Sequence, residues 1–139
     1  MSEFEKFTIS QVAVWIKDRK VLLLEDAAHP GKWIIPGGRI DQGEPWEEAF
    51  ARELLEELSL NSFETVALLD VDVWYWGEAN QPQSAVARLI SSDQEEIQIS
   101  SEHLQMRWFF EGELSDEMFV WPNGLRMCKK GFEKKKEGE

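Results

Sequence analysis

Several features are scarce in this sequence of 139 residues, and each scarcity excludes a class of protein. Cys128 is the only cysteine, so no intrachain disulfide can form and we expect a reducing, cytoplasmic setting. No stretch approaches the roughly 20 consecutive apolar residues that span a bilayer, and residues 1–6 lack the apolar run of a secretory signal. We therefore expect no membrane partner.

Basic residues are outnumbered, with 15 Lys and Arg against 27 Asp and Glu, for a formal net charge of −12. A stable nucleic-acid partner would require a basic surface, so we expect none. The acidic balance instead fits a site that divalent cations neutralise before an anionic substrate binds. We expect that substrate to be a small molecule.

The chain has no internal repeat, and its length suffices for one domain with a hydrophobic core. We predict a single domain over residues 1–139. The segment from about residue 130 to 139 is rich in Lys and Glu, and we expect this tail to fray.

An acidic helix is the strongest local prediction. Residues 45–58 are dominated by Glu, Leu, Ala and Arg, with Pro45 suited to the first turn. Helical spacing puts Glu53, Glu56 and Glu57 on one face. Because like charges repel, this arrangement gains nothing structurally unless a cation binds there.

The segment before the helix predicts a short strand at residues 33–35, broken by Pro36-Gly37-Gly38. Glycines at positions 37 and 38 allow the backbone to approach a ligand closely. The unit is therefore a strand, a glycine turn, a loop and an acidic helix.

This unit resembles the signature of the Nudix hydrolases, in particular the MutT-like nucleotide pyrophosphohydrolases. The family pattern over residues 38–60 is matched by Gly38, Glu44, Arg52, Glu53, Leu54, Glu56 and Glu57. The one departure is Ser59, where the family has Gly. Ser at a left-handed helix terminus costs about 1 kcal/mol, and Asn61 is an alternative residue for that conformation.

The resemblance implies an α/β Nudix fold, in which a mixed β-sheet is sandwiched between α-helices. It implies catalytic roles for Glu57, Glu53 and Arg52, with Arg52 orienting Glu53. It also implies that Glu44 supports the site. Gly37 and Gly38 belong to the same loop, where a backbone carbonyl at Gly38 could add a metal ligand.

A divalent cation is the expected cofactor. Mg²⁺ prefers oxygen ligands, bridges phosphate oxygens and acidifies bound water. We predict Mg²⁺, with Mn²⁺ possible, and the ligands Glu53, Glu56, Glu57, Gly38 and Glu102. Glu95 and Glu96 are alternative loop carboxylates to Glu102, and His103 is either a base or, as we expect, a surface histidine.

Seven Trp residues stand out in a chain of this length. Trp74, Trp76 and Trp121 are candidates to stack on a nucleobase, an interaction worth about 1–3 kcal/mol, although each could instead simply pack. Arg39 follows the glycine turn and is a candidate phosphate contact. These four residues are the predicted substrate-binding set.

Outside the signature, residues 7–16, 21–24, 64–76, 84–90 and 106–110 read as strands. We also predict a short strand around residues 97–99 and a weaker helix over residues 125–133. Alternating strands with one helix in mid-chain and one at the end agree with an α/β sandwich.

The leading function is Mg²⁺-dependent hydrolysis of a diphosphate linkage in a nucleoside diphosphate derivative, with a nucleoside triphosphate favoured. Alternatives are a dinucleoside polyphosphate or nucleotide-sugar hydrolase, or a non-catalytic nucleotide sensor. Tyr75 keeps the dinucleoside reading open, because such hydrolases carry a tyrosine in this region. Many family members dimerise, so a homodimer is possible.

Overall fold

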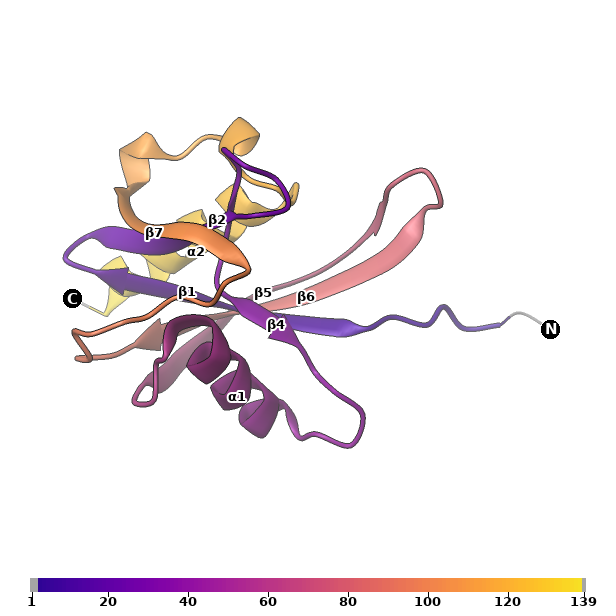
Figure 1. Ribbon diagram of the computed structural model, residues 1–139, viewed down its shortest axis with the longest axis horizontal. Coiled ribbons are helices and arrows are strands. Elements are labelled where there is room, and N and C mark those ends of the chain that lie inside the picture. Colours follow the sequence, from indigo (N-terminus) through magenta and orange to yellow (C-terminus); the bar gives the residue numbers. More distant parts are fainter. Residues whose placement is uncertain (1–2, 139) are drawn as a thin grey trace.

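The computed structural model describes residues 3–138. Over this range seven strands, two α-helices and two single 3-10 turns alternate along the chain (Figure 1). The strands are β1 (Ile9–Lys17), β2 (Lys20–Asp26), β3 (Trp33–Ile34), β4 (Gly37–Arg39), β5 (Glu64–Trp76), β6 (Gln81–Ser91) and β7 (His103–Phe110). The helices are α1 (Trp46–Leu58) and α2 (Gly124–Glu137), and the 3-10 turns are η1 (Glu111–Glu113) and η2 (Asp116–Met118).

The sheet is mixed, and β1 is its centre. The strand order is β3-β2-β1-β6-β5, with β4 paired to β1 and β7 paired to β2. β1 runs parallel to β6 over residues 9–15 and antiparallel to both β2 and β4. Because β4 borders β1, the glycine turn is held directly against the middle of the sheet.

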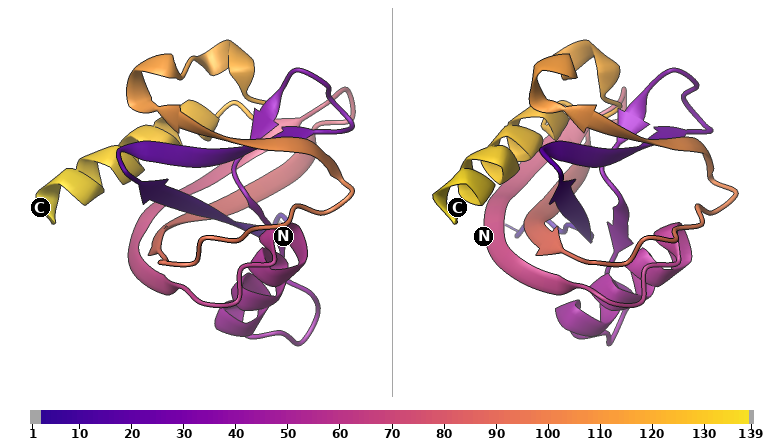
Figure 2. Two further views of the ribbon diagram at one scale, coloured as in Figure 1. Left: turned by 60° about the vertical axis from the view of Figure 1, so that its left-hand side comes forward. Right: turned by 90° about the vertical axis from the view of Figure 1, so that its left-hand side faces the viewer.

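The helices cover opposite sides of the sheet, as Figure 2 shows. On one side, Met127, Cys128 and Phe132 of α2 join a core with Val14 and Ile16. On the other, α1 contributes to a second core, which contains Ala13, Trp15, Phe50, Leu54 and Leu58. Successive residues of β1 therefore face different cores, as the two-residue period of a strand requires. The predicted sandwich is confirmed.

The end of the chain corrects the prediction of a frayed tail. α2 continues to Glu137, and the helix is anchored on the core up to Phe132, whose side chain is buried. Gly131 lies so close to Val14 that an added Cβ would fall 2.5 Å from Val14 Cγ1. Residue 139 lies outside the described residues. Burial of Phe132 and close packing at Gly131 explain why a charged segment keeps a helical register here.

The strand predicted around residues 97–99 is wrong. Residues 92–100 have no regular secondary structure, although Ile97 and Ile99 pack against the α1-side core. Their hydrogen bonds go instead to the end of α1: Gln98 N–H donates to the Leu58 carbonyl and Ser100 N–H to the Glu57 carbonyl. Apolar alternation alone did not distinguish a strand from a segment that covers a helix end.

Ser59 adopts the left-handed conformation that the family's glycine would take, with φ 53° and ψ 32°. Its hydroxyl donates to the Gln98 carbonyl at 3.3 Å. The alternative that Asn61 takes this conformation is wrong, since Asn61 has no positive φ. The non-glycine residue therefore keeps the expected helix terminus.

No helix among residues 3–138 is long and apolar enough to cross a membrane.

Candidate active site

A cavity of about 670 Å³ lies between the glycine turn, α1 and the start of α2. Two groups of side chains line it. The acidic group consists of Glu53, Glu56, Glu57 and Glu102, beside the backbone of Gly37 and Gly38. The aromatic group consists of Trp33, Trp74, Phe119 and Trp121. The cavity thus brings a carboxylate cluster and a group of aromatic side chains together.

Arg52 connects the loop before α1 to the carboxylates of the helix. Its Nε and Nη2 donate to the two oxygens of Glu44, at 2.6 and 2.9 Å. Its Nη1 donates to Glu53 at 2.8 Å and lies 3.3 Å from Glu56. The guanidinium hydrogen bond holds the pKa of Glu44 at about 2. The orienting role of Arg52 toward Glu53 stays a prediction, and the guanidinium contacts Glu53 through one nitrogen and Glu44 through two.

Glu53 packs directly on Gly38. A Cβ added at Gly38 would fall 2.0 Å from Glu53 Oε2, so only glycine leaves room for this carboxylate. The Glu53 side chain is 15% exposed. Burial raises its pKa, against the lowering effect of Arg52. A carboxylate that is desolvated in this way gains stability from a cation placed beside it.

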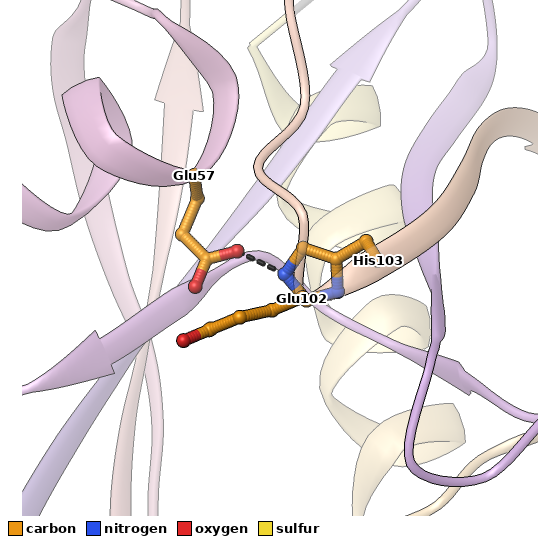
Figure 3. Close-up of side chains that lie close together, drawn as sticks. All are labelled: Glu57, Glu102 and His103. Atoms are coloured by element: carbon orange, nitrogen blue, oxygen red, sulfur yellow. Dashed lines mark hydrogen bonds and ion pairs between the residues drawn. The ribbon is translucent and has the colours of Figure 1, made fainter.

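Glu57, Glu102 and His103 form a second cluster at the same site (Figure 3). Their ligand atoms all lie within 4.8 Å of one another. Glu57 and His103 are buried, Glu102 is exposed, and His103 Nε2 is hydrogen-bonded to Glu57 Oε2. The expectation of a surface histidine is therefore wrong. Burial lowers the pKa of His103, but the hydrogen bond to Glu57 and the charges of Glu57, Glu102 and Asp26 together raise it.

The segment that covers the end of α1 brings this second cluster into place. Ser100 N–H binds the carbonyl of Glu57, and His103 N–H binds the carbonyl of Ser100. Glu102 is thereby placed on the cavity wall, whereas Glu95 and Glu96 are exposed and absent from that wall. The strand predicted over residues 106–110 in fact begins at His103, which pairs with Asp26 of β2, and this earlier start was not evident from the sequence.

The donor set fits a hard divalent cation. Glu53, Glu56, Glu57 and Glu102 line the same cavity with carboxylates, and Gly38 leaves open space for Glu53. Carboxylates on a rigid helix with a neighbouring backbone loop are the ligands that Mg²⁺ and Mn²⁺ use. Glu56 is the most solvent-accessible of the helix set, with its side chain 60% exposed.

The aromatic side of the cavity depends on the β5–β6 hairpin, which projects from the body of the molecule (Figure 1). Trp74 and Trp121 line the cavity, with ring centroids 6.0 Å apart. Trp76 does not line it and packs on Trp121 from outside, at 5.2 Å. The direct contact of Trp76 with substrate stays a prediction, and in this structure Trp76 contacts Trp121. Arg39 is exposed and lines the cavity.

Asn123 is a cavity residue that sequence reasoning missed. It is 5% exposed and occupies the N-cap position of α2, yet its side chain makes no cap hydrogen bond. Its Nδ2 donates instead to Asp72 Oδ2 at 3.1 Å. An Asn after the Trp121-Pro122 turn and before a helix was the available signal, but the contact with Asp72 could not be read from it.

The family comparison decides the identity of this fold. The model of the NUDIX domain matches residues 8–126. The chain belongs to the Nudix family. Among solved structures, a Nudix hydrolase from Nitrosomonas europaea matches with a TM-score of 0.79 at 22% identity, over 94% of this chain and 91% of that one. A Caenorhabditis elegans Ap4A hydrolase matches with a TM-score of 0.72 at 20% identity, over 96% and 98%. These likenesses establish the Nudix fold.

One curated relative is an RNA pyrophosphohydrolase of Bartonella henselae, 32% identical over 108 residues. That match covers 74% of this chain and 56% of the relative. Two further curated relatives are matched over 17% and 34% of their length. The matches thus cover between about a sixth and a little over half of the length of these curated relatives.

Proposed function

We propose that this Nudix domain hydrolyses a diphosphate linkage in a nucleoside diphosphate derivative, with a divalent cation as cofactor. The observation that carries the proposal is the cavity wall shared by Glu53, Glu56, Glu57 and Glu102. Four carboxylates facing one cavity in a chain of net charge −12 suit a site completed by cations and an anionic substrate.

In the proposed reaction, water attacks a phosphorus of the diphosphate linkage, and a P–O bond to the bridging oxygen breaks. A bound Mg²⁺ or Mn²⁺ would neutralise phosphate charge and lower the pKa of its bound water. Glu53, Glu56, Glu57 and Glu102, with the Gly38 carbonyl, would hold it. Arg52 orients Glu53 and Glu44, while Glu57 or Glu53 orients the attacking water. Arg39 contacts a phosphate.

A nucleoside triphosphate is the favoured substrate class. Trp74 and Trp121 offer aromatic faces on which a base can stack. Asn123 Nδ2 is taken by Asp72, so its side-chain oxygen remains as an acceptor. The Bartonella henselae relative is named as an RNA pyrophosphohydrolase, and an RNA with a 5′-triphosphate ends in the same chemical group as a nucleoside triphosphate.

The test is a hydrolysis screen of purified protein on nucleoside triphosphates, oxidised nucleoside triphosphates, 5′-triphosphorylated RNA, dinucleoside polyphosphates and nucleotide sugars. Each substrate is offered with Mg²⁺, with Mn²⁺ and with EDTA, for the wild type and for Glu57→Gln. Metal-dependent release of a nucleoside monophosphate that Glu57→Gln abolishes supports the proposal. Nucleotide binding without turnover on any substrate would favour the sensor.

The dinucleoside reading has less support from the cavity. Tyr75 is 54% exposed, lies outside the cavity wall and packs near Phe7, at 6.4 Å between ring centroids. The cytoplasmic location and the homodimer stay predictions. Light scattering at several protein concentrations tests the dimer.

A further inference from the structure

His103 lies beside the carboxylates of the proposed site but has no role in the reaction proposed above. Its side chain is only 3% exposed, and Nε2 is bonded to Glu57 Oε2. The other ring nitrogen, Nδ1, is buried without a hydrogen-bond partner among the described residues. The ring therefore has one directed contact, and that contact is with a carboxylate of the cavity wall.

The surroundings of the ring determine where its proton lies. A neutral imidazole carries its proton on one nitrogen and a lone pair on the other. A proton on Nδ1 would be buried without an acceptor and would turn the Nε2 lone pair toward the Glu57 carboxylate, which is repulsive. A proton on Nε2 donates to Glu57 and is present in the neutral and in the protonated ring. His103 is thus a hydrogen-bond donor to Glu57.

We propose that His103 is the positioning residue of Glu57: its Nε2–H fixes one carboxylate oxygen, Oε2, so that the other, Oε1, is presented to the cation beside Glu102. This inference rests on the proposed function. In Figure 3 the Glu57 carboxylate points one oxygen at the imidazole and the other away from it, on the side where the Glu102 side chain ends. Fixing a ligand through one of its own oxygens is how outer-shell groups raise metal affinity.

A direct metal ligand is the competing role for His103, and the contacts argue against it. Metal-bound histidines almost always donate their second N–H to a carboxylate, a carbonyl or a water. Nδ1 of His103 has no such acceptor among residues 3–138. Nε2, the nitrogen that faces the site, is already bonded to Glu57.

The experiment uses two substitutions of similar length that differ in the donor. His103→Gln keeps an N–H that can reach Glu57, whereas His103→Met fills the space without one. His29→Met removes an exposed histidine and is the control. Mn²⁺ affinity is measured without substrate by electron paramagnetic resonance of the free ion, together with kcat, KM and the midpoint of thermal unfolding.

We expect His103→Met to weaken Mn²⁺ binding by about 10- to 100-fold, the usual loss when an outer-shell partner is removed. kcat falls with it, KM for the nucleotide changes little, and His103→Gln stays within about threefold of the wild type. The inference is overturned if His103→Met binds Mn²⁺ with wild-type affinity. It is also overturned if His103→Gln loses as much Mn²⁺ affinity as His103→Met does. If the Met variant does not fold, the Gln variant decides alone: retained affinity supports the inference, and a tenfold loss overturns it.

A different result would overturn the proposed function itself. Glu53→Gln removes a predicted cation ligand that His103 does not touch. If the wild type binds no Mn²⁺, or if Glu53→Gln binds Mn²⁺ as well as the wild type does, the cation site is not where we propose it. If only the His103 inference is wrong, Glu53→Gln still binds Mn²⁺ more weakly than the wild type does. The two outcomes are therefore distinguishable.

Discussion

Arg52 binds both oxygens of Glu44, a residue eight positions earlier in the chain, through Nε at 2.6 Å and Nη2 at 2.9 Å. The same guanidinium also donates to the backbone carbonyl of Arg39, at 3.2 Å. One side chain therefore joins β4, the loop before α1 and α1 itself. A two-oxygen contact of this kind fixes direction as well as distance.

Replacing this arginine by lysine tests whether geometry or charge matters. Arg52→Lys keeps the charge but cannot contact Glu44, Glu53 and the Arg39 carbonyl together. We expect kcat to fall by about 10- to 100-fold, because a displaced Glu53 misaligns the reacting groups. Steady-state kinetics measure this, with Arg107→Lys as the control on an exposed pair with Glu113. Equal rates for the two variants would contradict the prediction.

The lowered pKa of Glu44 predicts that part of the stability of the fold is lost at acidic pH. Its pKa of about 2 in the folded chain lies below the roughly 4.3 of an unfolded Glu. Its contribution to stability is therefore complete above about pH 4.3 and is lost as the pH falls toward 2. We expect the unfolding midpoints of wild type and Glu44→Gln to converge over this window. Glu48→Gln controls for the loss of one negative charge, and a constant difference between wild type and Glu44→Gln would refute the claim.

Gly38→Ala tests the space beside Glu53. The added Cβ would lie 2.0 Å from Glu53 Oε2, at the far end of a side chain that can rotate. We expect the fold to survive, with an unfolding midpoint within a few degrees, and Mn²⁺ affinity to drop at least about tenfold. Gly112→Ala is the matched control, since a Cβ there meets nothing within 4 Å. Unchanged Mn²⁺ binding in Gly38→Ala would show that Glu53 tolerates displacement.

Trp121→Ala tests the aromatic side of the cavity. Loss of one stacking face costs about 1–3 kcal/mol, so we expect KM for the best nucleoside triphosphate to rise roughly 5- to 150-fold, with a smaller change in kcat. Tyr75→Ala is the comparison, because Tyr75 is outside the cavity wall. A larger effect of Tyr75→Ala than of Trp121→Ala would move the assignment toward dinucleoside polyphosphates.

Ser59→Gly tests the departure from the family signature. Glycine adopts φ 53° without the steric cost that Ser bears, and the substitution removes a weak hydrogen bond to the Gln98 carbonyl, at 3.3 Å. We expect a gain of about 0.5–1 kcal/mol in the free energy of unfolding with unchanged kcat. Ser59→Ala should be no more stable than the wild type, because it keeps the Cβ. Chemical denaturation measures both, and a destabilised glycine variant would contradict the expectation.

The local sequence pattern was sufficient to predict a helix or strand wherever the residues that determine that element lie within it. The acidic helix was predicted over residues 45–58 and is observed at Trp46–Leu58, and the strand predicted over residues 64–76 is observed as β5. Both are long and strongly patterned. The predictions for residues 97–99 and for the charged tail were wrong because the secondary structure of these segments depends on what they pack against. Residues 97–99 cover the end of α1, and the tail packs on the core around Val14.

The order of residues alone was enough to identify the family and to place three carboxylates on one helix face, since helix periodicity fixes the relation between Glu53, Glu56 and Glu57. Which residues of other elements contact this helix face depends on the tertiary packing. The burial of His103 against Glu57 and of Asn123 against Asp72 joins residues 46 and 51 positions apart. No periodicity spans such separations, because they are set by how β7 and α2 pack on the sheet.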